Sequence, residues 1–372
     1  MKIALVHDYL TQYGGGERVL QALCEMFPDA PIYTLVYDEK ATGRVFAGRT
    51  IKTSFLQRLP FTKRYHRMFP LLMPMAIEQF DFSEFDIVLS ISASFAKGII
   101  TKPATRHINY CLTPTRFLWD DSHRYIKESY SLWPVRKLLP FLVSYLRVWD
   151  KEAAYRVDEY IGISEFVRRR IKKYYERESV LIYPPVDVSK YHIDPDASVG
   201  AGYFLMVGRL VSYKKFDLAV KAFSAMELPL KIVGDGPERP KLQRMAGKNI
   251  EFLGLVSDYR MPELYSRAQA VIFPQEEDFG LVPLEAMASG RPVIAYRAGG
   301  ALETIEEGVT GIFFDQQTEI DLSLAVGKFQ QTIFDPHKIR EHAMKFDINI
   351  FKEKIRGILR LDAKTENPPV AF

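Results

Sequence analysis

Four charged side chains in the second half of the chain have the spacing that a site for a phosphorylated ligand requires. Arg209 and Lys214 follow one apolar run, where a guanidinium and an ammonium can neutralise a diphosphate. Glu277 follows another apolar run, and Glu285 stands eight residues later. If a helix begins between them, the two carboxylates lie on nearly the same face. These four residues predict a site that offers both cationic and anionic groups.

Backbone groups beside these side chains are a second sign of ligand binding. Four of the residues between the two glutamates can expose N–H groups at the start of a helix: Phe279, Gly280, Leu281 and Val282. In the first half, Gly14-Gly15-Gly16 follows an apolar run, and glycines let a phosphate approach the backbone. A dinucleotide site at this turn is the weaker alternative. Asp38 stands where a ribose-binding acid would fall, but Val19 occupies the position of the third glycine.

Apolar runs and segments of helical period alternate along the whole chain. The runs expected to be strands cover residues 2–9, 32–38, 86–92, 107–112 and 159–164 in the first half, and residues 202–208, 230–236, 250–256, 270–274 and 292–296 in the second. Strands that alternate with helices predict parallel sheets, and ligands bind at the carboxyl ends of such strands. We therefore expect the α/β class, with two Rossmann-like domains whose parallel sheets face each other across a cleft.

The boundary between the two domains is expected where prolines interrupt regular structure. A chain of 372 residues exceeds the size at which a single hydrophobic core stops growing. Pro184 and Pro185 stop the regular pattern, and a linker-like stretch follows. We expect an N-terminal domain over residues 1–187 and a C-terminal domain over residues 188–347. An amphipathic helix over 348–362 is expected to rejoin the first domain.

Composition places the chain among ordinary globular proteins of a reducing compartment. It is 47% hydrophobic and 26% charged, which is typical of folded domains. The two cysteines, Cys24 and Cys111, form neither a disulfide framework nor a metal-ligand set. The N-terminal apolar run reaches His7 at once, which is too short for a signal peptide, and no run of about 18 apolar residues is present to span a membrane. We expect a cytoplasmic protein.

The motifs of the second half resemble one family. Glu277 and Glu285 enclose a Phe-Gly-Leu sequence, and Gly208-Arg209-Leu210 with Lys214 and then Gly234-Asp235-Gly236-Pro237-Glu238 precede them in order. Over residues 202 to about 315 this resembles the nucleotide-sugar-binding half of retaining glycosyltransferases of family 4, which have the GT-B fold. The first half is more loosely similar, through its Gly-Gly-Gly-Glu turn and through YCLTPTRFLWD at residues 110–120, to bacterial O-antigen and capsule mannosyltransferases.

This resemblance implies a role for each residue singled out above. Arg209 and Lys214 would hold the donor diphosphate, Glu285 the ribose hydroxyls, and Glu277 with the backbone of 279–282 the sugar and phosphate. Gly15 and Gly16 would approach the diphosphate from the N-terminal, acceptor-side domain. Because cationic side chains and helix N-termini can neutralise the leaving diphosphate, no metal and no cofactor are expected. The resemblance also implies retention of configuration without a protein nucleophile.

The sequence departs from this family at one position near the expected reaction centre. Relatives commonly carry a His between the Cys and Thr of the YC-x-TP motif, where this chain has Leu112. His7, Arg116, Trp119 and Asp120 are the acceptor-side residues that remain, and His107 is expected to be structural. The departure keeps a catalytically inactive nucleotide-sugar-binding protein as an alternative. The second alternative is a nicotinamide-dependent dehydrogenase that uses the Gly14–Gly16 turn.

Two basic and aromatic stretches predict a membrane surface as partner. Residues 40–77 contain eight Lys and Arg and no acid, interleaved with large apolar side chains, and residues 132–149 repeat the pattern. No nucleic-acid recognition motif accompanies them, so nucleic acid is not expected. An anionic membrane surface fits, because a lipid-linked glycan acceptor would be met at the inner face of the cytoplasmic membrane. The alternative is that the two stretches form helices whose apolar faces belong to the protein core.

The expected reaction is transfer of a sugar, with mannose from GDP-mannose as first choice, in surface polysaccharide synthesis.

Overall fold

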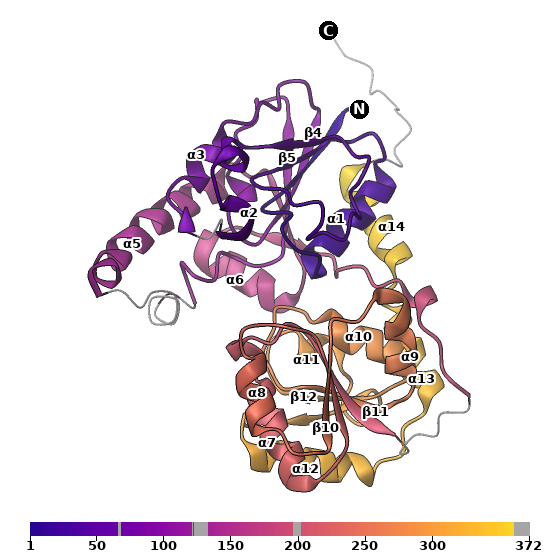
Figure 1. Cartoon of the computed structure of the whole chain (residues 1–372). Helices are drawn as coiled ribbons and strands as arrows, with labels where there is room; N and C mark the ends of the chain where they lie inside the picture. Colours follow the sequence, from indigo (N-terminus) through magenta and orange to yellow (C-terminus); the bar gives the residue numbers. More distant parts are fainter. Residues whose placement is uncertain (66–67, 121, 123–132, 196–201, 361–372) are drawn as a thin grey trace. The chain divides into compact units, whose positions relative to one another are not determined.

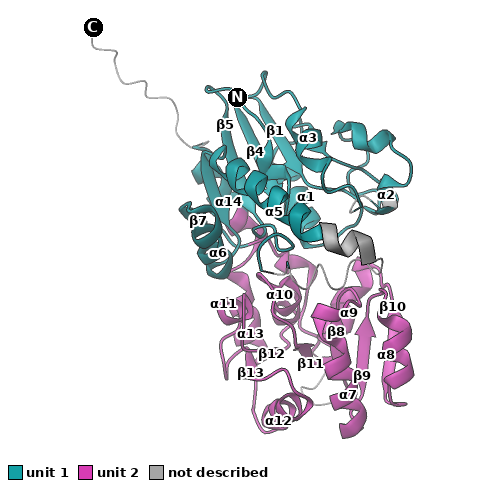
Figure 2. Cartoon of the chain, turned by 90° about the vertical axis from the view of Figure 1, so that its left-hand side faces the viewer, with its two compact units in different colours: residues 1–183, 352–372 teal, residues 184–351 magenta. Residues whose placement is uncertain are grey.

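The computed structural model describes residues 1–65, 68–120, 122, 133–195 and 202–360. Figure 2 shows its two compact units: unit 1 comprises Met1–Tyr183 and Lys352–Phe372, and unit 2 comprises Pro184–Phe351. The chain therefore leaves the first unit once and returns to it through a single helix. Each unit is built around one parallel sheet.

Unit 1 contains a seven-stranded parallel sheet with the order β3-β2-β1-β4-β5-β6-β7. Its strands are β1 (Ile3–His7), β2 (Ile32–Thr34), β3 (Ile51–Thr53), β4 (Ile87–Ser92), β5 (Arg106–Cys111), β6 (Glu159–Gly162) and β7 (Ser179–Leu181). The central strands β1 and β4 pair along their length, with Ala4 opposite Val88 and Val6 opposite Ser90. β4 is buried at every position, as expected of a parallel strand covered on both faces.

Helices cover both faces of this sheet (Figure 1). The helical segments of unit 1 are α1 (Gly15–Met26), η1 (Phe55–Arg58), α2 (Thr62–Tyr65), α3 (Met73–Glu78), η3 (Ala96–Gly98), α5 (Trp133–Tyr155), α6 (Glu165–Tyr175) and the second part of α14 (Ile348–Leu359). α14 lies beside α1, where Lys352 Nζ donates to Glu25 Oε2 at 2.7 Å. It also reaches the sheet, since Arg106 Nη2 donates to the carbonyl oxygen of Ile358 at 3.0 Å.

Unit 2 contains a six-stranded parallel sheet with the order β10-β9-β8-β11-β12-β13. Its strands are β8 (Tyr203–Val207), β9 (Leu230–Val233), β10 (Ile250–Gly254), β11 (Ala268–Phe273), β12 (Val293–Tyr296) and β13 (Gly311–Phe314). α7 (Phe216–Met226), α8 (Arg239–Met245) and α12 (Glu319–Gln330) form one helical layer. The other layer consists of α9 (Met261–Ser266), α10 (Leu281–Ala288), α11 (Ala301–Thr304) and α13 (Pro336–Met344). Short 3-10 turns complete the unit: η4 (Val188–Lys190), η5 (Ser212–Lys214) and η6 (Asp258–Arg260).

The predicted α/β class with two parallel sheets is confirmed, whereas several local expectations differ. The strand expected over 32–38 ends at Thr34, and its extension is reduced to an isolated bridge between Leu10 and Tyr37. Three short strands, β3, β7 and β13, were not expected from the sequence. The helix expected over 348–362 ends at Leu359, and residues 361 and 362 lie outside the described residues.

Two further observations concern the cysteines and the longest helices. Cys24 and Cys111 are both free and buried, and burial raises the pKa of the Cys24 thiol to about 11. Within the described part of the chain, none of the helices is both long and apolar enough to cross a membrane.

Candidate active site

Arg209 and Glu277 follow two neighbouring strands of unit 2, at the point where the strand order reverses. From β8 the chain proceeds to β9 and β10 on one side and then returns to β11 on the other. In open parallel sheets, this reversal opens a crevice at the carboxyl ends of the two central strands, and ligands bind there. Arg209 follows the end of β8, and Glu277 follows the end of β11. The sheet topology therefore brings the predicted phosphate-binding and sugar-binding residues to the same crevice.

Lys214 and Glu277 form an ion pair at this crevice. Lys214 Nζ contacts Glu277 Oε1, and the two side chains are only 13% and 19% exposed. Gln275 Nε2 donates to the same carboxylate oxygen at 3.1 Å. The ammonium and the carboxylate neutralise each other.

The loop that carries Arg209 is supported by the Gly-Asp-Gly turn after β9. Gly234 has a φ of +133°, and a β-carbon there would lie 1.9 Å from the carbonyl oxygen of Gly208. Leu210 N donates to the Asp235 carbonyl at 2.9 Å, which pairs the two loops. This glycine is needed for close backbone packing, and the side chain of Arg209 itself is exposed.

Glu285 lies on α10 with most of its carboxylate covered. It is 4% exposed, and Tyr265 OH on α9 donates to its Oε2 at 2.6 Å. The tyrosine fixes one carboxylate oxygen. Sequence reasoning missed Tyr265, because the two residues are twenty positions apart and no motif links them.

The loop between β11 and α10 is held in shape by a glycine at its end and by a pair of glycines that packs against it. Gly280, with a φ of +90°, precedes α10 and lets the chain turn into the helix. Gly300 N donates to the Glu277 carbonyl at 2.8 Å, and a β-carbon at Gly300 would lie 2.3 Å from Cα of Phe279. Phe279 is buried, whereas Leu281 and Val282 are half-buried at the start of α10. The Gly299-Gly300 pair was therefore a signal that the sequence reasoning did not use.

The switch point of unit 1 lies between β1 and β4, and His7 stands there at the end of β1. Its Nδ1 lies 3.1 Å from the Tyr9 carbonyl oxygen, a geometry that places the ring proton on Nδ1 and leaves Nε2 as an acceptor. Nε2 is buried and has no hydrogen-bond partner among the residues that the structure describes. A β-carbon at Gly16 would lie 3.4 Å from this nitrogen. His7 thus offers an unused acceptor beside the first turn of α1.

Leu112 occupies the space in front of the same glycine. A β-carbon at Gly16 would lie 2.8 Å from Cδ1 of Leu112, so the leucine and the first turn of α1 are packed closely. Gly14 N donates to Glu17 Oε2 at 2.9 Å, which closes the start of the helix, and Gly15 begins it. Leu112 and His7 therefore both lie close to Gly16, and the side chain at position 112 is apolar.

Asp8 is a buried carboxylate that sequence reasoning did not assign. Its two oxygens accept hydrogen bonds from the four consecutive backbone N–H groups of Ala93 to Ala96, at 2.6 to 2.9 Å. The bonds hold the segment after β4 at the carboxyl edge of the sheet. Asp8 thereby shapes this edge without offering a free charge to a ligand.

The three other acceptor-side residues belong to the segment Leu112–Asp120, which we call the β5 loop. Trp119 Nε1 donates to Asp150 Oδ2 at 2.9 Å, and its ring stacks on Tyr174 with centroids 4.9 Å apart. Asp120 accepts from Tyr174 OH and forms an ion pair with Arg170. Arg116 is half-buried in the same loop. The polar atoms of Trp119 and Asp120 thus hold the loop in place.

His107 has the structural environment expected for it. The side chain is fully buried in β5, and its Nε2 lies 2.8 Å from Ser90 Oγ on β4. Burial lowers its pKa to about 4, so the ring is neutral near pH 7. Among the described residues, no group of three or more His, Cys, Asp and Glu side chains is arranged to hold a metal ion.

Comparison with known structures supports the architecture derived above. A crystal structure of Anabaena HepE in complex with UDP and glucose superposes with a TM-score of 0.69 at 19% identity, covering 97% of this chain and 99% of that one. Two parallel α/β units with central switch points define the GT-B fold.

Residues 189–346 match the family model described as Glycosyl transferases group 1, so the chain carries a domain of that family. It is 31% identical over 195 residues to the GDP-mannose-dependent alpha-(1-6)-phosphatidylinositol monomannoside mannosyltransferase of Mycolicibacterium smegmatis, covering 44% of this chain and 51% of that protein. It is 28% identical over 152 residues to O-antigen chain mannosyltransferase C of Escherichia coli, covering 37% and 40%. The chain spans about half the length of the curated relatives it matches.

Proposed function

We propose that the protein is a retaining glycosyltransferase that uses a nucleotide-sugar donor and no metal. The observation that carries the proposal is the Lys214–Glu277 ion pair at the switch point of a glycosyl transferases group 1 domain, with Arg209 close after the end of β8. Departure of a nucleoside diphosphate builds negative charge, and preorganised cations stabilise it. Glu285 is assigned to the ribose, and the N–H groups around Phe279 to Val282 to the phosphate.

GDP-mannose is our first choice of donor. Two relatives are named as mannosyltransferases, and one of them as GDP-mannose-dependent. HepE, which shares the fold, was crystallised with UDP, so UDP-sugars are the competing class. Gly15 and Gly16 are assigned to the approach of the diphosphate, and the free Nε2 of His7 to a sugar hydroxyl.

The donor assignment is tested by incubating the wild-type protein with a panel of GDP- and UDP-sugars and measuring bound nucleotide and released nucleoside diphosphate. Release of GDP from GDP-mannose supports the proposal. Binding without release, even when acceptor is supplied, favours the inactive sugar-nucleotide-binding protein. Selective binding of NADH would favour the dehydrogenase.

Chelation separates a metal-free mechanism from a metal-assisted one. We expect millimolar EDTA to leave the initial rate of transfer within about twofold of the untreated enzyme, because Arg209 and Lys214 supply the charge that a divalent cation would otherwise supply. The rate is measured before and after dialysis against the chelator. A complete loss of activity, restored by Mg²⁺ or Mn²⁺, contradicts the metal-free mechanism.

The acceptor in this proposal is a lipid-linked glycan met at the anionic inner face of the cytoplasmic membrane. Phosphatidylinositol and O-antigen appear in the names of the two mannosyltransferases. The apolar side chains of the segment 40–77 are of two kinds. Phe46 and Leu56 belong to the core, whereas Phe61 is 77% exposed and Met68 is 63% exposed. Exposed cations accompany them, namely Lys40, Arg44, Lys52, Arg58 and Lys63.

A second exposed apolar set lies on α5. Phe141, Tyr145 and Val148 follow each other at helical spacing and are 74%, 65% and 66% exposed. The opposite face of the helix is buried through Leu139, Val143 and other residues, so α5 is apolar on two sides. An apolar outer face suits shallow insertion into a membrane surface.

Membrane docking predicts a salt-dependent association with anionic vesicles. Changing Arg58 and Lys63 to Gln, together with Phe61 to Ser, should reduce co-sedimentation with phosphatidylglycerol vesicles severalfold, because each cation near the surface contributes about 1 kcal/mol. The attraction should weaken as salt rises. The matched control changes Lys241 and Arg244 to Gln and Leu255 to Ser, which are exposed positions of unit 2. Equal pelleting of both variants, or no wild-type binding, contradicts the docking surface.

A further inference from the structure

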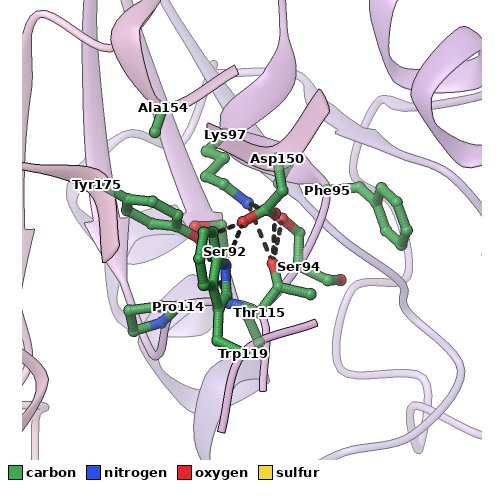
Figure 3. Close-up of polar contacts among 12 residues, drawn as sticks. Ser92, Ser94, Phe95, Lys97, Pro114, Thr115, Trp119, Asp150, Ala154 and Tyr175 are labelled. Atoms are coloured by element: carbon green, nitrogen blue, oxygen red, sulfur yellow. Dashed lines mark hydrogen bonds and ion pairs between the residues drawn. The ribbon is translucent and has the colours of Figure 1, made fainter. Parts of the chain in front are cut away.

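A buried polar network that no step above uses lies next to the β5 loop (Figure 3). Its charged members are Lys97 and Asp150, whose Nζ and Oδ1 atoms lie 2.5 Å apart and whose side chains are 2% and 1% exposed. Replacing such a pair by packed apolar residues is often neutral for stability or increases it. The pair therefore has to be explained by what it holds in place.

Asp150 is the centre of the network. Its Oδ1 accepts from Lys97 Nζ and, at 2.6 Å, from Thr115 Oγ1. Its Oδ2 accepts from Trp119 Nε1 and from Tyr175 OH, each at 2.9 Å. Four donors fill the hydrogen-bonding capacity of a carboxylate. The aspartate on α5 thereby joins η3, the β5 loop and α6.

Two of the four donors belong to the β5 loop. Thr115 and Trp119 lie four residues apart, so one carboxylate fixes two points of the loop. Arg147, one helical turn before Asp150 on α5, donates from Nε to the Leu118 carbonyl at 2.7 Å. The loop follows the carboxyl end of β5, the edge at which parallel α/β sheets bind ligands.

We infer that Asp150 is a positioning residue that sets the conformation of the β5 loop for the acceptor. The inference rests on the proposed function and on the assignment of Arg116, Trp119 and Asp120 in this loop to the acceptor side, which the family resemblance implies. Asp150 is buried, so it acts through Thr115 and Trp119. Displacing an orienting segment by about 1 Å can lower the rate about a hundredfold. A rigid anchor for the loop therefore offers a functional reason to keep two charges buried.

Two buried tyrosines provide a matched pair of variants. Tyr175→Phe removes one donor to Asp150 and, with it, the hydroxyl oxygen that accepts from Thr115 N at 3.3 Å. Tyr160→Phe removes a hydroxyl that donates to the Ala154 carbonyl outside the network. Both rings are buried, and their centroids lie 6.1 Å apart. We expect Tyr175→Phe to raise the KM for the acceptor about tenfold and that for the donor less than about twofold. Tyr160→Phe should change neither.

Amide hydrogen exchange over residues 113–119 of the full-length protein tests the anchor without relying on activity, provided that Thr115 is left out because its own N–H bonds to Tyr175 OH. Exchange should be faster than in the wild type in Tyr175→Phe and faster still in Asp150→Asn, and unchanged in Tyr160→Phe. The tyrosine pair decides the question even if Asp150→Asn, which leaves Lys97 without a counter-charge, fails to fold.

The outcomes separate this inference from the proposed function. Unchanged exchange in Tyr175→Phe, similar acceptor KM values in the two tyrosine variants, or a loosened loop with an unaltered acceptor KM would each overturn the role of Asp150. The proposed function is tested on the wild type alone, by its binding and turnover of nucleotide sugar. If the wild type fails there, the proposed function falls and the acceptor role falls with it, while the exchange data still show whether Asp150 holds the loop.

Discussion

Arg209→Ala is expected to lower kcat/KM for sugar transfer roughly a hundredfold, corresponding to about 3 kcal/mol of transition-state stabilisation. The guanidinium at the end of β8 would neutralise the charge that develops on the departing diphosphate. Because the side chain is exposed, thermal unfolding should change little. Arg209→Lys should restore only part of the activity, since an ammonium cannot form the bidentate contacts of a guanidinium.

Arg244→Ala is the matched control for this experiment. Arg244 is also exposed in unit 2, on α8, and the proposal gives it no ligand. Steady-state kinetics of both variants should therefore differ by nearly the whole hundredfold. Near wild-type turnover in Arg209→Ala, or an equal loss in Arg244→Ala, contradicts the diphosphate assignment.

The second large effect is that substitutions of the two glutamates change different kinetic parameters. Glu285→Gln should raise the donor KM about tenfold with little change in kcat, because a ribose contact of about 1.5 kcal/mol is made equally in the ground and transition states. Glu277→Gln should lower kcat more than it raises KM, since the proposal assigns this carboxylate to the sugar and the structure pairs it with Lys214. Donor saturation curves for both variants provide the comparison.

Glu276→Gln serves as the control for the glutamate experiment. Glu276 adjoins Glu277 on the same loop but is exposed, and the proposal assigns it no role. The same kinetic pattern in Glu277→Gln and Glu285→Gln would refute the division of roles. Loss of thermal stability in Glu285→Gln would instead indicate that its bond with Tyr265 is mainly structural.

The sequence was informative where a strand, its loop and the next helix are contiguous. The stretch from β11 to α10 was predicted because an apolar run, a Gly-containing turn and a helical run follow each other locally. β3 and β7 escaped prediction because each has three residues at an edge of the sheet, too few to show a period. β13 has only four residues, although all are buried.

Long-range polar contacts could not be predicted in the same way. Asp150 meets Lys97 at a separation of 53 residues and Tyr175 at a separation of 25. Asp8 binds backbone groups 85 to 88 residues away. In the linear sequence, Asp8, Lys97 and Asp150 look like ordinary surface charges. Their partners become neighbours only when the sheet forms. The local motifs indicated the candidate ligand-binding residues, and the structure added the residues that pack against them.

The return of α14 to unit 1 has a consequence for synthesis on the ribosome. The helix segment that pairs with Glu25 and Arg106 is translated after all of residues 184–351. At roughly 5–20 residues per second, this interval lasts about 10 to 30 seconds. During that time the nascent N-terminal unit exposes the surface that Lys352 and its neighbours later cover, so a fragment ending at residue 183 is an unfinished domain. Separate production of this unit requires residues 352–359 to be supplied as well, through a linker or as a peptide.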